Sequence, residues 1–154
     1  MKNNESLWGE IRSLLLVTHF SNVDELKKYR EALKEAKLNV HVCGILAVVE
    51  TKKEKQTMLA LKSVVYCSEQ EINLFGRLKN EEAMKQLSNR YDALMVVGDY
   101  SSRFEKLLKK VRVKVSIGAN SSVDFLTLKL KTDSASPSHL INFAKQTLEK
   151  INKV

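Results

Sequence analysis

The sequence predicts a three-layer α/β fold with a mostly parallel sheet, and three observations lead to that prediction. Two short runs, residues 14–17 and 93–97, are apolar at every position, as expected for strands that are buried on both faces. Helical stretches of roughly 10–15 residues separate the strand-like runs, which is typical of βα units with right-handed crossovers. The chain has 154 residues with one Pro and five Gly, a length and composition that match an ordinary globular domain.

The first half of the chain alternates between strands and a helix. Three apolar runs predict strands, at residues 13–18, 39–49 and 63–68. A helix capped by Ser21 or Asn22 follows the first run and ends near Lys37. Gly44, inside the second run, indicates a bulge or a close backbone approach. Residues 51–61 fit a short helix and an ordered loop equally well.

The second half of the chain continues the alternation. A helix capped by Asn80 precedes a doubly apolar strand at residues 91–97. The turn at residues 98–102 leads into a strongly amphipathic helix. A last helix begins at Ser136 and Pro137, since Ser is a good cap and Pro fits the first helical position.

Two further segments, residues 111–117 and 123–131, alternate between apolar and polar side chains. This pattern favours strands near a sheet edge, and their short connection allows an antiparallel pair. We expect the strands at 13–18 and 91–97 to be parallel, neighbouring and central, with helices on both faces. The prediction is a three-layer αβα fold of the Rossmann-like or flavodoxin-like kind.

Domain organisation and location follow from what the sequence does not contain. No linker, repeat or charge block interrupts the pattern, so residues 1–154 are predicted to form one domain, on which residues 1–12 pack as an amino-terminal extension. No apolar run approaches the ~20 residues of a membrane span, and no signal-peptide pattern follows Met1. Cys43 and Cys67 form no CxxC pair, as in reduced proteins. We therefore expect a cytoplasmic protein.

The net charge of +8 is concentrated in the carboxyl-terminal third, because residues 101–154 carry eleven basic and four acidic side chains. We call the densest run the basic face, and it consists of Arg103, Lys106, Lys109, Lys110, Arg112 and Lys114. A one-sided basic field attracts an acidic protein or nucleic acid. Phe104 is the one aromatic among these cations and belongs to the apolar side of its helix, so binding of nucleic acid would be weak and independent of sequence. The alternative is a solvated face that serves solubility.

In an open parallel sheet, ligands bind beyond the carboxyl ends of the strands. Three turns rich in polar residues are predicted there, and their ligand-binding candidates are Thr18, His19, Ser21, Asn22, Gly98, Asp99, Ser101, Ser102, Gly118, Asn120 and Ser121. Two of these turns open helices, whose free N–H groups favour an anion such as a phosphate. The alternative is plain helix capping, because Ser, Asn and Asp are common at helix starts.

Signals for catalysis are weak. His19 and Asp99 would form a base with its orienting carboxylate if their strands are adjacent, and the alternative is a lone loop histidine. The sequence has no zinc-ligand spacing, no glycine-rich phosphate loop and no nucleophile elbow. We therefore expect no cofactor, no metal and no complete catalytic site.

The segment Phe75-Gly76-Arg77 belongs to no predicted helix or strand. Phe75 is interpreted either as an exposed docking knob or as a plug that fills the core while Gly76 makes the turn. We favour the plug.

Several short patterns together resemble a known family. They are NLFGRLK at residues 73–79, KKYR at residues 27–30, the pair Tyr91-Asp92, and VSIG at residues 115–118. Over about residues 13–150 the chain resembles a family of small uncharacterised cytosolic proteins from Bacteroidetes, and this resemblance implies no activity and no functional residues. Residues 91–118 are also distantly similar to the amino-terminal half of bacterial heptosyltransferases. We see no second, nucleotide-sugar-binding half, so we do not expect that activity.

The sequence therefore predicts a binding module without enzymatic activity, whose basic face takes an anionic partner. The alternative function is a small-ligand domain for a phosphate-bearing metabolite or nucleotide at the strand ends. Lysines near the predicted sheet edge disfavour pairing between sheets, so we expect a monomer or a dimer joined through helices.

Overall fold

The computed structural model describes residues 6–36, 38, 43–51, 54, 60–61, 63–134 and 136–151. Some sequence predictions lie outside these residues. They concern residues 1–5, the helix end at Lys37, the strand start at residues 39–42, and most of residues 51–61.

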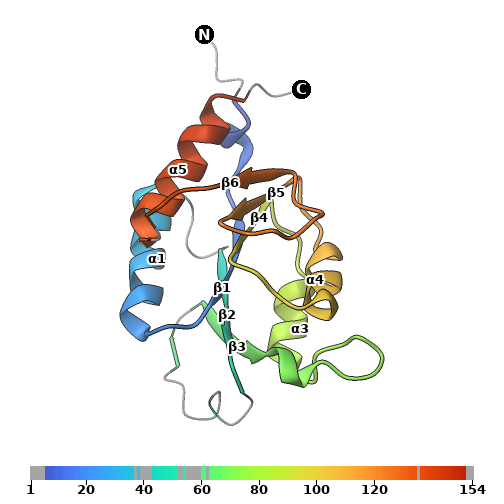
Figure 1. The fold of residues 1–154 in the computed structure, drawn as a ribbon. Coiled ribbons are helices and arrows are strands. Elements are labelled where there is room, and N and C mark those ends of the chain that lie inside the picture. The colour runs from blue at the N-terminus through green and yellow to red at the C-terminus, as the bar shows by residue number, and fades with distance from the viewer. Residues whose placement is uncertain are drawn as a thin grey trace.

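In the described part of the chain, six strands form one sheet in the order β3-β2-β1-β4-β5-β6 (Figure 1). Every neighbouring pair is parallel. The strands are β1 (Leu14–His19), β2 (Gly44–Val49), β3 (Val64–Ser68), β4 (Ala93–Val97), β5 (Val115–Ala119) and β6 (Leu128–Leu130). The expected neighbours, β1 and β4, pair in the middle of the sheet, with Leu15 opposite Leu94. The predicted α/β class and its central pair are confirmed.

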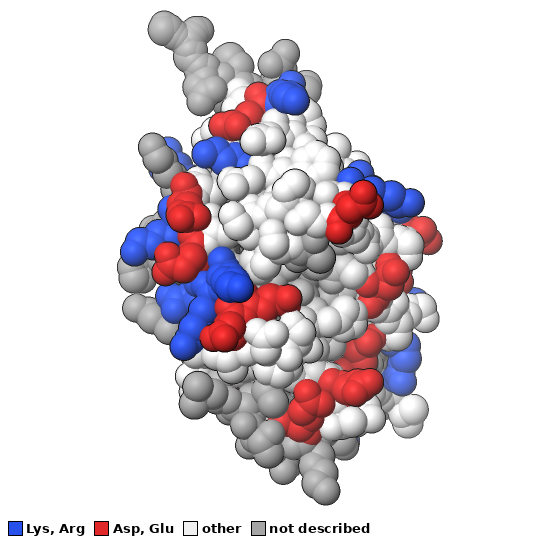
Figure 2. Space-filling view, turned by 60° about the vertical axis from the view of Figure 1, so that its left-hand side comes forward, with Lys and Arg blue, Asp and Glu red and all other residues white. Residues whose placement is uncertain are grey.

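Helices cover both faces of this sheet. They are α1 (Val23–Glu35), α3 (Glu81–Ser88), α4 (Ser102–Lys109) and α5 (Pro137–Glu149). Figure 1 shows α1 and α5 on one face and α3 and α4 on the other. Each begins at a side-chain cap, provided in chain order by Asn22, Asn80, Ser101 and Ser136. On the side of α1 and α5, acidic and basic side chains are interspersed (Figure 2).

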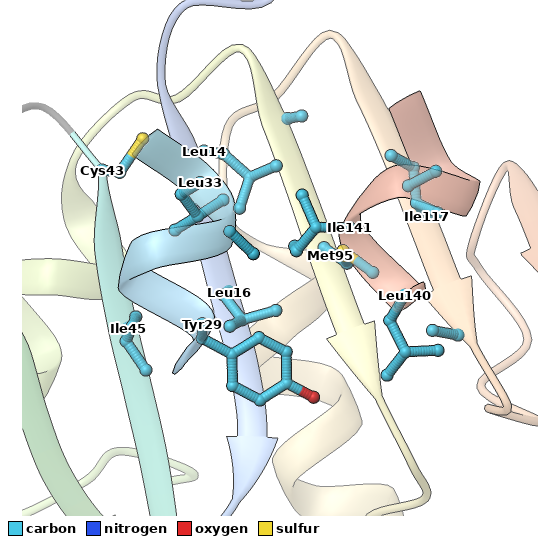
Figure 3. Close-up of a cluster of buried hydrophobic side chains, with 14 of the residues drawn as sticks. Leu14, Leu16, Tyr29, Leu33, Cys43, Ile45, Met95, Ile117, Leu140 and Ile141 are labelled. Carbon is cyan, nitrogen blue, oxygen red and sulfur yellow. The ribbon is translucent and has the colours of Figure 1, made fainter. Parts of the chain in front are cut away.

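The core has two layers, one on each face of the sheet, because side chains alternate along a strand. Leu14 and Leu16 point toward α1 and α5, whereas Leu15 and Val17 belong to the cluster beneath α3 and α4. Figure 3 shows the first layer, in which the strand residues Leu14, Leu16, Ile45, Met95 and Ile117 face Tyr29, Leu33, Leu140 and Ile141 of the helices. This double burial explains why residues 14–17 of β1 and residues 93–97 of β4 are apolar at every position.

The predictions for residues 111–131 need correction. β5 begins at Val115 and is buried at all five positions, so residues 111–114 precede it and the strand is not half-exposed. β6 contains only residues 128–130 and pairs with β5 in parallel, with Leu128 opposite Ile117. The antiparallel pair is therefore wrong, although β6 does lie at the sheet edge.

The physical reason is the route of residues 120–127. Val123 and Leu126 are buried in the cluster beneath α3 and α4, so this segment returns across the sheet instead of making a hairpin. Gly118 permits that route, because a Cβ atom there would lie 2.6 Å from Cδ1 of Leu126. The Ser116 hydroxyl fixes the returning chain by accepting the Thr127 N–H at 2.9 Å.

The amino-terminal segment lies against the end of α5. The Leu7 N–H donates to the Ile151 carbonyl at 2.8 Å, and Trp8 packs on the core cluster beneath α1 and α5. None of the helices in the described part of the chain is long and apolar enough to cross a membrane.

Candidate functional site

The carboxyl ends of β1 and β4 lie side by side at the point where the strand order reverses. Such a point is the usual ligand crevice of open α/β sheets. Two predicted candidates there are helix caps, since Asn22 accepts the Glu25 N–H at 2.8 Å and Ser101 accepts the Phe104 N–H at 3.3 Å. Thr18 is buried, whereas Ser21 and Ser102 are exposed.

His19 bridges the two loops at this crevice. Its Nε2 atom lies 2.6 Å from the backbone carbonyl of Asp99, and because a carbonyl only accepts, Nε2 carries the proton. The imidazole stacks on Tyr100 with ring centroids 4.3 Å apart and lies over Gly98, whose φ of +85° places the backbone in the left-handed region. His19 therefore connects its own strand end to the loop after β4, although the residue is exposed.

The Asp99 carboxylate has a different partner. Its Oδ1 atom accepts from the Ser122 N–H at 2.6 Å and from the Ser122 hydroxyl at 2.7 Å. These hydrogen bonds hold the pKa of Asp99 below its ordinary value. The carboxylate thus orients the loop after β5 and not the imidazole, so the structure brings the two residues together without forming the acid–base dyad that we considered.

A second feature of this edge is an open cleft of about 810 Å³ beyond β5 and β6. It is lined by Asp99, Asn120, Ser121, Ser122, Lys129, Lys131, Thr132 and Asp133. Asn120 shapes it, since its φ is +50° and its side chain accepts the Thr132 N–H at 2.9 Å. Asn120 and Ser121 were predicted as ligand candidates, but the predicted Gly118 is buried in β5. The two lysines were missed as ligand candidates because their segment was assigned to an edge strand.

The basic face separates into two groups. Three of its cations have partners within the protein: Arg103 donates to the Asn73 carbonyl, Arg112 donates to the Ser88 carbonyl at 2.9 Å, and Lys114 pairs with Asp92 at 3.7 Å. The other three, Lys106, Lys109 and Lys110, are exposed on and just after α4. No described carboxylate lies within ion-pair distance of these three, which we call the lysine cluster.

A short hairpin lies beside the lysine cluster. Its tip carries Leu74 and Phe75, which are 94% and 87% exposed. A groove of about 440 Å³ between this tip and α4, here called the hairpin groove, is lined by Leu74, Phe75, Gly76, Arg103, Lys106, Lys109 and Lys110. One wall is apolar and the other is cationic.

The prediction that Phe75 plugs the core is therefore wrong. Ile72 and Leu78, at the base of the hairpin, are 8% and 4% exposed and anchor the segment by themselves. Gly76, with a φ of +76°, makes the turn as expected. Because four apolar residues share seven positions, sequence spacing alone does not say which pair is buried. The tight Asn-x-x-Gly turn is the signal that assigns Leu74 and Phe75 to the tip.

Other potential chemistry has little support in the described part of the chain. Cys43 and Cys67 are buried and form no disulfide with each other. Burial raises the pKa of the Cys43 thiol, which disfavours its reactive thiolate. Among the described residues, no group of three or more His, Cys, Asp or Glu side chains is placed to hold a metal ion.

Comparison with known proteins gives a family without an assigned activity. The model of a family of unknown function, DUF6913, matches residues 1–151. The chain belongs to this DUF6913 family. A search of curated proteins found no match. This match confirms the resemblance to a family of unknown function. The patterns at residues 27–30, 73–79 and 91–92 indicated that resemblance.

A solved structure with a similar fold is the E. coli heptosyltransferase WaaC with ADP-2-deoxy-2-fluoro heptose, with a TM-score of 0.49 and 14% sequence identity. The match covers 92% of this DUF6913 chain and 50% of the heptosyltransferase chain, so this chain spans about half its length. At this identity and TM-score, the similarity says nothing about the activity of this protein.

Proposed function

We propose that the protein is a non-enzymatic binding module whose lysine cluster docks an anionic partner. The observation that carries the proposal is that Lys106, Lys109 and Lys110 are exposed, adjacent and without a described carboxylate partner. Neighbouring cations repel one another. An anion that binds beside them offsets this repulsion, because each of the cations attracts it.

The charge composition of the helices supports a localised field. Helix α1 carries four acidic and four basic side chains, and its side of the molecule shows both signs interspersed (Figure 2). Residues 102–110 instead carry four cations and one anion, Glu105. A partner with several negative charges is therefore attracted to α4 and not to α1.

Binding of defined polyanions tests this proposal. Fluorescence anisotropy with a labelled poly-glutamate peptide and a labelled single-stranded DNA is measured at about 50 and about 200 mM salt. We expect salt-sensitive binding to the wild type and none to the variant K106E/K109E/K110E. The matched control is K27E/K28E/K34E, which makes the same change in net charge with three exposed lysines of α1.

The control variant should bind as the wild type does. Equal losses in the two variants would show that net charge alone acts, and no binding to the wild type would contradict the proposal directly. Circular dichroism of each variant establishes that it is folded.

The cleft beyond β5 and β6 supports a second candidate function, the binding of a small phosphate-bearing ligand. Its size of about 810 Å³ suits a metabolite, and Lys129 and Lys131 provide positive charge at its wall. Thermal stabilisation by a nucleotide or by inorganic phosphate, lost in K129Q/K131Q, would favour this candidate. Unchanged melting would count against it.

We also propose a cellular location and an oligomeric state for the module. Cys43 and Cys67 are buried and form no disulfide with each other, which suits a reducing cytoplasm, where acidic proteins and nucleic acid are available partners. The edge strand β6 is only three residues long and carries Lys129, which disfavours sheet-to-sheet pairing. This favours a monomer or a dimer joined through helices.

A further inference from the structure

Leu74 and Phe75 are the only large apolar side chains that are exposed in the described part of the chain. Because both side chains are almost fully exposed, the fold gains almost no stability from burying them. Ile72 and Leu78 already anchor the hairpin, with 8% and 4% of their surface exposed. The tip therefore has no packing role in the isolated protein, and its apolar surface is available to another molecule.

The tip is held in one conformation by its own hydrogen bonds. The Asn73 N–H donates to the Arg77 carbonyl at 2.8 Å, and the Asn73 side chain accepts the N–H groups of Phe75 and Arg77 at 2.9 and 3.1 Å. The Gly76 N–H returns to the Asn73 carbonyl at 3.0 Å. A partner would thus meet a preorganised knob, and little ordering entropy is lost on binding.

Arg103 ties this knob to the lysine cluster. Its guanidinium donates to the Asn73 carbonyl, which fixes the hairpin to the first turn of α4. The apolar tip and the cations of Lys106, Lys109 and Lys110 consequently line the same hairpin groove. An apolar contact beside a rim of charge is the usual composition of a protein-binding hot spot.

We propose that the hairpin groove binds an acidic protein segment that carries a large apolar side chain. The apolar side chain contacts Leu74 and Phe75, while flanking Asp or Glu side chains pair with the lysine cluster. This inference rests on the proposed function and names the partner class. A protein segment is favoured over a nucleic acid because the groove has a single aromatic, Phe75, and single-strand binders stack successive bases on several.

Two labelled peptides of equal length and charge test the inference. The first peptide has two Leu and one Phe placed among Asp and Glu residues. The second has the same sequence with Ser at the three apolar positions. We expect the wild type to bind the first at least about tenfold more tightly, because only the first peptide buries apolar surface. The affinity of the wild type for each peptide should fall as the salt concentration rises. The ratio of the two affinities should stay constant, since salt does not screen apolar contacts.

Two variants separate this inference from the proposed function. L74S/F75S leaves the charge unchanged, so we expect it to bind both peptides equally and as weakly as the wild type binds the Ser peptide. K106E/K109E/K110E should lose both. Both variants are checked for folding by circular dichroism.

The outcomes have distinct meanings. Equal binding of the two peptides by the wild type would overturn the inference and leave the anionic partner in place. A single-stranded DNA of equal charge that binds more tightly than the first peptide, and is weakened by L74S/F75S, would overturn it in favour of nucleic acid. No binding of any probe would overturn both proposals.

Discussion

Asp92 shows how one side chain connects three strands. Its Oδ2 atom accepts the N–H groups of Arg12 and Ser13, at 2.9 and 3.2 Å, just before β1, and its Oδ1 atom lies 3.7 Å from Nζ of Lys114, just before β5. Burial alone would raise the pKa of Asp92, but these hydrogen bonds and the charge of Lys114 together lower it. The Tyr91-Asp92 pair of the sequence thus has a structural role at the amino ends of the strands.

We predict that Asp92→Asn lowers the free energy of unfolding by about 1–2 kcal/mol at pH 7, because a neutral amide oxygen replaces the charged acceptor of the two backbone hydrogen bonds. The pKa of Asp92 is lower in the folded chain than its ordinary value of 3.8. The stabilisation is therefore complete above about pH 4 and is lost as the pH falls through the lowered folded value. Urea unfolding of both proteins between pH 7 and pH 3 measures this difference.

Lys114→Gln is the matched control, because it removes the ion pair and keeps both backbone hydrogen bonds. Lys114 is 60% exposed, so its loss should cost less than about 1 kcal/mol. A D92N difference that stays constant down to pH 3 would contradict the assigned role of the carboxylate.

At the scale of elements, the crossover between β5 and β6 depends on Gly118. A Cβ atom there would lie 2.6 Å from Cδ1 of Leu126 and 3.3 Å from Cβ of Ser121. We predict that Gly118→Ala destabilises the protein by about 1–3 kcal/mol through overpacking. In the background of Leu126→Ala the same change should cost clearly less, since the atom it meets is gone.

Urea unfolding of the four proteins gives the coupling between the two positions. Strictly additive losses would mean that the close approach of Leu126 is not the reason for glycine at this position.

The hairpin gives a second prediction at this scale. Phe75→Ser should change the free energy of unfolding by less than about 0.5 kcal/mol, as at other exposed sites. Leu78→Ala should cost about 2–4 kcal/mol, because Leu78 is 4% exposed and its removal leaves a cavity. Thermal or urea unfolding compares them, and a cost above 1 kcal/mol for Phe75→Ser would return Phe75 to the core.

An element could be predicted from the sequence where the residues that determine it lie close together in the chain. Residues 14–17 and 93–97 are apolar at every position because both faces of β1 and β4 are covered, so their central place could be predicted. The caps Asn80 and Ser136 were predicted too, since a cap acts within one turn. The parallel pairing of β6 could not be predicted, because Leu126 continues the alternating pattern of residues 123–131 and yet packs in the cluster beneath α3 and α4, outside the strand.

The candidate site was predicted less completely, for the same physical reason. The lysine cluster lies on α4 and at its carboxyl-terminal cap, Lys110, and could be identified from helical spacing. Its apolar neighbour at residues 74–75 comes from a hairpin about thirty positions earlier, brought near by Arg103 and Asn73. The predicted partners His19 and Asp99 do meet, but through a backbone carbonyl, and no sequence pattern distinguishes that contact from a side-chain pair.

At the scale of the whole molecule, two surfaces compete as the binding site. The first surface is the hairpin groove, which the hairpin tip and the lysine cluster line. The second is the open cleft beyond β5 and β6. The net charge of +8 acts on any anion at long range, so affinity alone does not say which surface is occupied. The location of the bound anion distinguishes them.

Mapping by nuclear magnetic resonance locates that anion most directly, because a chain of 17.5 kDa gives assignable amide spectra. The ¹⁵N-labelled protein is titrated with the acidic peptide that carries Leu and Phe. We predict that the largest amide shift changes fall at residues 73–77 and 103–110 and disappear in K106E/K109E/K110E. Largest changes at residues 120–122 and 129–133, or changes spread evenly over all lysine-bearing surfaces, would contradict it.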